Sequence, residues 1–298
     1  MTSTWVHPRG SLERDGWSTV VDSAIDGWSH SGLRVGDLSE GDSLALPAGD
    51  VERIVVPLSG SFAVTGELGR VELSGRASVF AGPTDVMYLG AGTAAALTGS
   101  GRVAVAEAIA SIRHPDRYIG RDRVPVEFRG AGMASRQVHN FGVPGVLDAH
   151  RIIACEVITP AGNWSSYPPH KHDAEREGLE SELEEIYYFE AAVEGDHPVG
   201  GGPAFGYVRA AASDERAIDF LSEVRTGDVA LVPYGWHGPC AAPPGYDLYY
   251  LNVMAGPGAA RAWLIEDHPD HAWVRGTWES ETIDSRLPFS RTEPGATR

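Results

Sequence analysis

Three histidines and a carboxylate are the side chains of this sequence that could hold a metal ion. His170 and His172 lie two residues apart, directly after Pro168 and Pro169. The two prolines keep the backbone extended, and residues two apart in an extended chain project to the same face. Both imidazoles are therefore expected to face one metal ion, and imidazole binds zinc, iron, manganese, nickel and copper.

Two ligands on one strand need further ligands from neighbouring strands. Glu184 and Glu185 open the apolar segment EEIYYF, where an unpaired charge is costly unless it meets a cation. We choose Glu185 because it directly precedes the apolar run, and Glu184 stays an alternative. His237 follows a Pro-Tyr-Gly-Trp turn that can bring it back over the site. The sequence therefore predicts a divalent metal ion held by His170, His172, Glu185 and His237.

Each of these pieces also has an ordinary structural explanation. A His-x-His pair occurs on surface strands, a Glu-Glu pair occurs in solvated loops, and a histidine after a turn often bonds a carbonyl. Their joint occurrence in this order, with Gly and Pro at the turn positions, favours the metal site. Cys155 and Cys240 are too few for a disulfide framework or a cysteine zinc site, and we expect both to be buried.

The elements that must position these residues are expected to be strands. With 36 Gly and 20 Pro among 298 residues, the chain is interrupted too often for long helices. Only 178–185 has the pattern of a helical turn. Runs of Val, Ile, Leu and Tyr predict an all-β fold with strands at 52–58, 61–65, 77–80, 85–89, 102–108, 151–158, 184–189, 204–209, 228–233 and 246–254.

A faint internal repeat suggests two related β-barrels. The segment 52–58 echoes 184–189, and 80–92 echoes 227–237. In this alignment Gly92 or Thr93 takes the place of His237, and the first half has no His-x-His pair. We expect an N-terminal unit without a metal site (1–130) and a C-terminal metal-binding unit (131–298), with a linker around 124–145. Chance similarity between Gly-rich segments is the alternative.

The charge of the chain excludes some partners. A formal net charge of −17, spread along the chain, repels nucleic acid and anionic lipid. Residues 1–23 contain no apolar run long enough for a signal peptide or a membrane span. These features predict a cytoplasmic protein with no nucleic-acid or membrane partner. The flat faces of β-barrels leave a homo-oligomer open.

The order His-x-His, Glu, then a turn followed by His is similar to the two motifs of cupins. Twelve residues separate His172 from Glu185 and one separates Gly235 from His237, which departs from the general cupin pattern. The segments GNWSSYPPHKHD, LEEIYYF and YDLYYLNVMAG, within roughly residues 136–275, resemble the 5-deoxyglucuronate isomerase family of inositol catabolism. That family has a long acidic insertion at the same place.

The resemblance implies a bicupin of two jelly-roll-like barrels that interconverts 5-deoxy-D-glucuronate and 2-deoxy-5-keto-D-gluconate. The substrate is then a small sugar acid, and the cofactor is one divalent metal ion, zinc or manganese with iron as a further candidate. An iron-dependent cupin dioxygenase would have the same ligands, and a non-catalytic sugar-binding cupin is a second alternative.

Other side chains near the predicted ligands could contact the substrate. Tyr187 shares a strand face with Glu185 and is a candidate acid or hydrogen-bond donor, although a packing role competes. Trp164 and Tyr250 are candidates for the wall of a substrate pocket, but large aromatic residues more often belong to the core. Lys171, the one lysine of the chain, is expected to point away from the histidines and to be peripheral.

Overall fold

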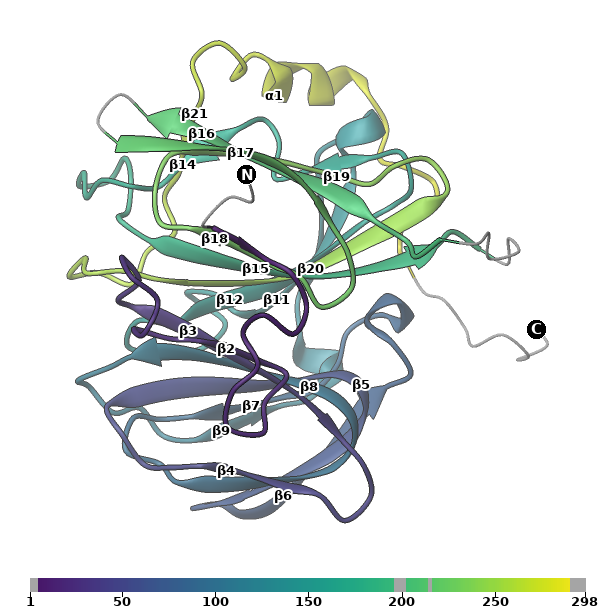
Figure 1. Ribbon diagram of the computed structural model, residues 1–298. Coiled ribbons are helices and arrows are strands. Elements are labelled where there is room, and N and C mark those ends of the chain that lie inside the picture. The colour runs from purple at the N-terminus through teal and green to yellow at the C-terminus, as the bar shows by residue number, and fades with distance from the viewer. Residues whose placement is uncertain (1–4, 196–201, 214–215, 290–298) are drawn as a thin grey trace.

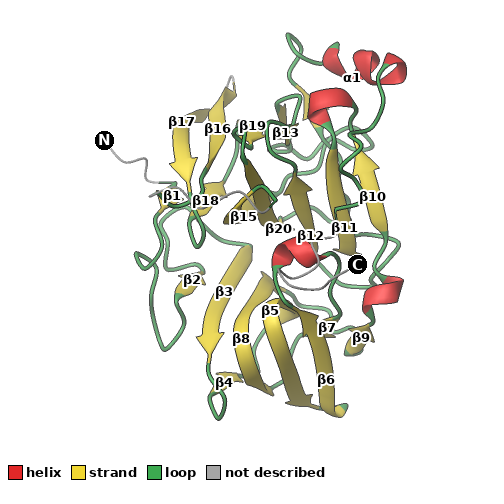
Figure 2. Cartoon of the chain, turned by 90° about the vertical axis from the view of Figure 1, so that its right-hand side faces the viewer, coloured by secondary structure: helices red, strands yellow, loops and turns green. Residues whose placement is uncertain are grey.

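The computed structural model describes residues 5–195, 202–213 and 216–289, and strands dominate it. Two β units are stacked one above the other, with the short helix α1 (Val274–Thr277) on the far side of the C-terminal unit (Figures 1 and 2). Strand β1 (Val6–His7) pairs with the C-terminal unit before the chain enters the N-terminal one (Figure 2). The predicted all-β fold is confirmed.

The C-terminal unit consists of two facing sheets with an apolar core between them. One sheet has the order β1 (Val6–His7), β18 (Val229–Val232), β15 (Glu184–Val193), β20 (Tyr246–Ala255), β12 (Ile153–Thr159), β11 (Arg136–Gly142) and β10 (Val126–Arg129). The other has the order β17 (Arg216–Val224), β16 (Gly206–Ser213), β19 (Trp236–Ala241), β14 (His170–Lys171) and β21 (Glu266–Asp267), and β13 (Trp164–Ser165) also pairs with β19.

The N-terminal unit is one sheet that folds over itself. Its order is β2 (Thr19–Val21), β3 (Ser31–Leu38), β8 (Ala95–Ile109), β5 (Val51–Gly66), β7 (Val86–Leu89) and β9 (Arg117–Ile119); in addition, β4 (Ser43–Leu46) pairs with β8 and β6 (Gly69–Arg76) with β5. The long strand β5 changes register between Pro57 and Ser59. Gly60 follows with φ +84°, and a Cβ there would lie 1.9 Å from the Ser100 carbonyl oxygen, so only glycine fits this bend.

Several sequence-based boundaries were wrong. The two strands expected at 52–58 and 61–65 are one continuous strand, because the register shift lets β5 bend without ending. Residues Val79–Ala81 form a 3-10 turn where a strand was expected. Within 178–185 there is no helix, although Glu180 N–H closes a single turn onto the Arg176 carbonyl oxygen at 2.9 Å. The expected linker carries β10 and β11. The remaining 3-10 turns are Arg121–Arg123, Gly132–Ala134 and Trp278–Ser280.

Strand pairing supports the internal repeat. In the N-terminal unit Arg53 of β5 lies opposite Leu89 of β7. In the C-terminal unit Glu185 of β15 lies opposite Val232 of β18. Arg53 and Glu185 are each the second residue of the echoing segments 52–58 and 184–189, and Leu89 and Val232 lie in the other echoing pair, 80–92 and 227–237. Arg53 therefore occupies in the first unit the place that Glu185 occupies in the second.

The two units share an apolar core, and each contributes one buried carboxylate that accepts hydrogen bonds from the backbone of the other. Strands β3 and β8 of one unit contact β15 and β20 of the other, and side chains from both units make up one buried cluster. Glu52 accepts backbone N–H bonds from residues 150–152, and Glu184 accepts them from residues 29–31. Each unit thus holds the segment that leads into a central strand of the other.

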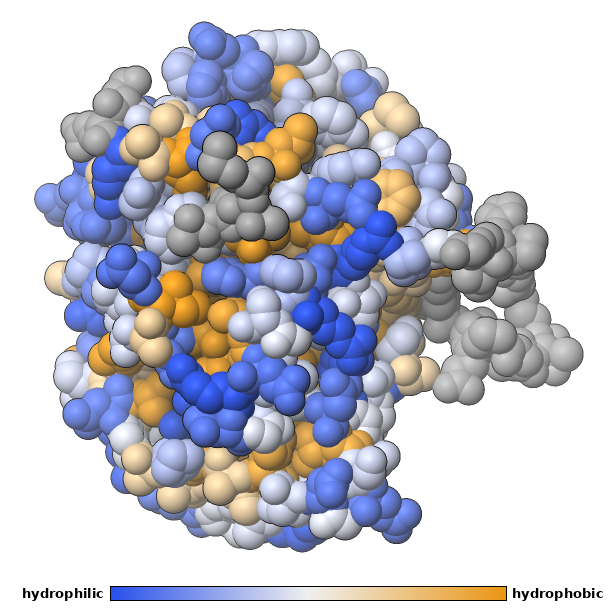
Figure 3. Space-filling model, viewed as in Figure 1, coloured by the Kyte–Doolittle hydropathy of each residue, from blue (hydrophilic) through white to orange (hydrophobic). Residues whose placement is uncertain are grey.

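On the face seen in Figure 3, hydrophilic and hydrophobic side chains are interspersed over both units.

Candidate metal centre and its cavity

The four predicted ligand side chains meet between the two sheets of the C-terminal unit. His170 and His237 lie directly opposite each other on β14 and β19. Candidate ligand atoms of His170, His172 and His237 all lie within 4.8 Å of one another. From the facing sheet, an oxygen of Glu185 lies 3.0 Å from His172 Nε2 and 2.9 Å from His237 Nε2. All four side chains are buried.

Each of the three imidazoles is held by a backbone carbonyl at its Nδ1 atom. The distances are 3.1 Å from His170 to the Pro168 oxygen, 2.9 Å from His172 to Leu183 and 3.0 Å from His237 to Gly235. Since a carbonyl oxygen only accepts, Nδ1 must carry the proton, and a neutral ring then has its lone pair at Nε2. This is the tautomer and the outer contact typical of metal-bound histidine.

The group fits a cation because its acceptors face one another. His237 Nε2 is buried and has no hydrogen-bond partner in satisfactory geometry, although Glu185 is close. A lone pair against a buried carboxylate is unfavourable unless a proton or a metal ion lies between them. Three imidazoles and one carboxylate are a ligand set that zinc, manganese and iron accept.

The charges at this site follow from burial and proximity. Burial and the neighbouring His237 lower the pKa of His170 well below its ordinary value, so this ring is neutral and able to coordinate. Burial by itself would raise the pKa of Glu185, but His237 and His172 hold that pKa well below its usual range. The carboxylate is therefore ionised. Burial opposes protonation of His172, yet contact with Glu185 raises its pKa.

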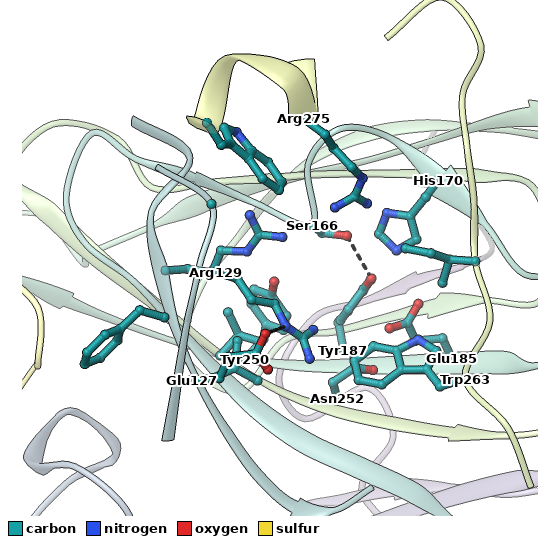
Figure 4. A pocket seen from close by; sticks show the side chains of 17 residues that line it. Glu127, Arg129, Ser166, His170, Glu185, Tyr187, Tyr250, Asn252, Trp263 and Arg275 are labelled. Atoms are coloured by element: carbon teal, nitrogen blue, oxygen red, sulfur yellow. Dashed lines mark hydrogen bonds and ion pairs between the residues drawn. The ribbon is translucent and has the colours of Figure 1, made fainter. Parts of the chain in front are cut away.

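A cavity of about 480 Å³ opens beside this group, a size typical of small-molecule sites. His170 and Glu185 line it on one side with Trp263, and Glu127 and Arg129 lie on the other (Figure 4). The remaining lining residues are Phe128, Gly130, Arg136, Val138, Val157, Ser166, Tyr187, Tyr250, Asn252, Ile265, Arg275 and Trp278. The cavity is thus bounded by polar, charged and aromatic side chains.

The structure brings two of the three predicted substrate-contacting residues to the cavity. Tyr187 and Tyr250 line it with ring centroids 5.1 Å apart, and the Tyr187 hydroxyl lies 3.2 Å from Ser166 Oγ (Figure 4). Trp164 is 45% exposed and is not a lining residue, because strand alternation on β13 turns Ser165 inward instead. Lys171 points away from the histidines, as expected, and its ammonium group bonds Asp173 and Glu180.

Glu184 and Glu185 project to opposite faces of β15. Glu184 accepts three backbone N–H bonds from residues 29–31, whereas Glu185 faces the imidazoles. In the N-terminal unit Arg53 takes the place of Glu185; its guanidinium bonds Glu107 at 2.7 Å and approaches the Thr93 carbonyl oxygen at 3.4 Å. An arginine with its own carboxylate thus fills the position that the histidines surround in the other unit.

The sequence reasoning missed the arginines of the cavity. Arg129 and Arg136 come from β10 and β11, inside the segment interpreted as a linker, and Arg275 comes from α1. Asn252 carries a signal that was available, since it is a polar residue within the apolar run YYLNVMA of β20. The contribution of α1 depends on a long return of the chain over the barrel, which no local pattern indicates.

The fold and the site define a cupin, with two similar β units and a His-x-His, Glu, His group in the second. A family model described as "KduI/IolB family" matches residues 5–274. The chain belongs to the KduI/IolB family, which confirms the resemblance stated from the motifs.

Curated relatives carry one common name. A protein of Geobacillus kaustophilus (strain HTA426), named 5-deoxy-glucuronate isomerase, is 40% identical over 276 residues, which cover 91% of this chain and 95% of the relative. A protein of Geobacillus thermodenitrificans (strain NG80-2) with the same name is 41% identical over 254 residues, covering 83% and 87%. These relatives are enzymes of the isomerase class by name.

Solved structures agree with the fold. The crystal structure of an IolB-like protein from Salmonella typhimurium LT2 is similar with a TM-score of 0.81 and 34% identity, covering 91% of this chain and 98% of that one. The oxalate decarboxylase of Lactobacillus farciminis is similar with a TM-score of 0.62 and 10% identity, covering 90% and 89%. The second likeness concerns the fold alone. Within the described residues, no helix has the length and apolar character needed to cross a membrane.

Proposed function

We propose that this chain is a metal-dependent 5-deoxy-glucuronate isomerase that interconverts 5-deoxy-D-glucuronate and 2-deoxy-5-keto-D-gluconate. The observation that carries the proposal is the group of three Nδ1-anchored imidazoles facing Glu185 at the edge of a polar cavity. The names of the curated relatives favour this activity over the two alternatives considered from the sequence, a dioxygenase and a non-catalytic sugar-binding protein.

The proposed cofactor is one divalent ion, zinc or manganese, with iron as a further candidate, held by His170, His172, Glu185 and His237. An aldose–ketose isomerase moves a proton from C2 to C1 while negative charge develops on the oxygens of both carbons. A bound divalent cation would supply the positive charge that stabilises this enediolate. In this proposal the C-terminal unit, which combines the predicted domain 131–298 with β1 and β10, performs the reaction, and the rest of the predicted domain 1–130 has no metal site.

Tyr187 is proposed to act as a hydrogen-bond donor or acid rather than as a base. Burial, together with the Glu185 carboxylate, raises the pKa of Tyr187 well above its ordinary value, so the phenol keeps its proton at neutral pH. Its hydroxyl lies beside Ser166 at the cavity (Figure 4). A protonated phenol at this position can donate to a substrate oxygen as charge builds on it.

Polar atoms without partners suit a polyhydroxy substrate. Asn252 Oδ1, Trp263 Nε1 and Trp278 Nε1 are buried and bond no described residue, and all three side chains line the cavity. Unpaired buried donors and acceptors are costly, so their presence around one cavity points to a ligand or ordered water that satisfies them. Tyr250 is proposed to form part of the wall; the outward placement of Trp164 offers that residue no such support.

The proposed activity is tested by incubating the metal-loaded protein with 5-deoxy-D-glucuronate and following isomer formation by NMR. We expect 2-deoxy-5-keto-D-gluconate to appear, and we expect protein stripped by a chelator to form none until metal is restored. In D2O, incorporation of deuterium from solvent would indicate proton transfer, whereas retention of the C2 hydrogen would indicate a hydride shift. A metal-loaded, folded protein that leaves the substrate unchanged would refute the proposal.

The two adjacent glutamates provide a matched pair of variants. Glu185→Gln removes the charge from the proposed ligand and is expected to lower metal content and turnover while the fold stays intact. Glu184→Gln weakens the contact with residues 29–31 and is expected to reduce the free energy of unfolding by about 1–3 kcal/mol while metal content is unchanged. Metal analysis and chemical denaturation of both variants would check this. The reverse pattern would make Glu184 the ligand.

A further inference from the structure

Arg136 is a buried arginine at the cavity for which the described residues provide no ion-pair partner. Arg136 is 7% exposed, and its guanidinium donates a hydrogen bond to the Ala134 carbonyl oxygen at 3.1 Å. The guanidinium carbon lies 5.4 Å from the centroid of the Trp278 ring, a cation–π contact. Across the described part of the chain, no acidic side chain forms an ion pair with Arg136. Most of the five donors of this group therefore lack a strong acceptor.

The other two arginines of the cavity differ in this respect. Arg129 donates to Glu127 at 2.8 Å, and Arg275 binds Asp267 through two nitrogens, one of them at 2.6 Å (Figure 4 shows Arg129 and Arg275). Each of these two charges is already balanced by a carboxylate on its own or a neighbouring element. Arg136 alone among the three brings an unbalanced positive charge to the cavity.

Such a charge is expensive to bury. A buried ion without a partner costs several kcal/mol, and native proteins normally pair it or expose it. Burial, with the nearby Arg129 and Arg275, lowers the pKa of Arg136 to about 10, although Tyr250 and Glu127 act in the opposite direction. The guanidinium nevertheless stays protonated at neutral pH. An anion entering the cavity would relieve this cost.

We propose that Arg136 is the anchor of a carboxylate subsite, which binds the acid group of the substrate while the other end of the substrate faces His170 and Glu185. This inference rests on the proposed function and deepens it. In 5-deoxy-glucuronate the reacting carbons C1 and C2 lie at one end of a six-carbon chain, and the carboxylate lies at the other. His170, Glu185 and Arg136 line one cavity, so a single small molecule can contact all of them.

The chemistry of the subsite follows from the guanidinium. Its planar fork can donate two parallel hydrogen bonds to a carboxylate, which a neutral amide at the same carbon cannot match. Trp278 covers the guanidinium, and the Nε1 atom of the same indole is without a partner. The subsite would therefore select sugar acids over neutral sugars of the same length and would fix which end of the substrate reaches the histidines.

Binding to metal-free protein tests this subsite without depending on turnover. Tryptophan fluorescence, to which Trp263 and Trp278 contribute from the cavity wall, would be titrated with 5-deoxy-D-glucuronate and with its neutral amide. We expect wild-type protein to bind the acid about 10- to 100-fold more tightly than the amide, the range of a charge-assisted hydrogen-bonded pair. Arg136→Met and Arg136→Gln are expected to bind the two compounds about equally.

Two further variants control for indirect effects. Arg136→Lys keeps the charge but not the fork, and it is expected to retain part of the preference for the acid. Arg70→Met, which removes an exposed arginine from β6, is expected to behave as wild type. Thermal unfolding identifies the folded variants, and on metal-loaded enzyme the neutral variants are expected to raise KM more than they lower kcat.

The possible outcomes separate this inference from the proposed function. A folded Met or Gln variant that still prefers the acid would overturn the subsite, because the shape of the cavity and not the Arg136 guanidinium would then be responsible for the preference. If wild-type protein binds the acid through Arg136 but does not isomerise it, the proposed function fails while the carboxylate subsite stands.

Discussion

His237→Ala is expected to remove both bound metal and isomerase activity. The imidazole is 2.9 Å from Glu185 and its Nε2 atom has no hydrogen-bond partner, so its replacement leaves an incomplete ligand set and a hole between the sheets. Loss of an outer-shell contact alone typically costs 10- to 100-fold in metal affinity. Removal of a ligand should have a larger effect. We expect metal affinity to fall at least about 100-fold and kcat to fall about 100- to 1000-fold.

Metal titration and the NMR assay would measure the two losses, with His170→Ala expected to behave in the same way. His114→Ala is the matched control, since His114 lies in the N-terminal unit away from the cavity. Circular dichroism would show whether the fold persists. A folded His237→Ala protein with full metal content and full activity would contradict the assignment of the site.

Glu156→Ala is expected to cause the largest loss of stability. Glu156 of β12 binds Arg76 of β6 through two hydrogen bonds, at 2.9 and 2.6 Å, and both side chains are buried. His139 and the Tyr249 hydroxyl complete the contacts of the carboxylate at 2.8 Å each. The substitution leaves the Arg76 charge buried between the units without its carboxylate, which typically lowers the free energy of unfolding by about 3–5 kcal/mol. Chemical denaturation would measure it.

The same pair gives stability a defined pH dependence. Although burial opposes ionisation, Arg76 and His139 hold the pKa of Glu156 at about 2, below the ordinary value of 4.5. Because the folded pKa is the lower one, the stabilisation is complete above about pH 4.5 and is lost as the pH falls towards 2. Glu72→Ala, which removes an exposed pair with Arg70, should cost less than about 1 kcal/mol. A similarly small loss for Glu156→Ala would contradict the role given to the buried pair.

The sequence was sufficient to predict that His170, His172, His237 and Glu185 lie close together, because its signals are local. Prolines before His170, strand alternation, the position of Glu185 before an apolar run and the turn before His237 each constrain one side chain. The spacing of Gly and Pro likewise excluded long helices. These features do not depend on how the two units pack, so the all-β fold and the direction in which each of the four side chains projects follow from short-range geometry.

The missed features depend on tertiary contacts between distant segments. The segment that carries Arg129 and Arg136 has no clear period because 126–128 of β10 are exposed at a sheet edge, whereas β11 is buried along its whole length. Glu184 was hard to separate from Glu185 because its function is to hold residues 29–31 of the other unit. Arg275 and Trp278 reach the cavity through a chain return that sequence spacing does not encode. Such residues can be identified only from the tertiary structure of the cavity.

The central claim is that activity depends on one ion held by His170, His172, His237 and Glu185. Anomalous X-ray diffraction at the absorption edge of the metal found in active enzyme tests it most directly. The predicted result is one strong peak at about 2.0–2.2 Å from the three Nε2 atoms and a Glu185 oxygen. An active enzyme whose crystals show no peak there, or show the metal bound at another place, would contradict the account.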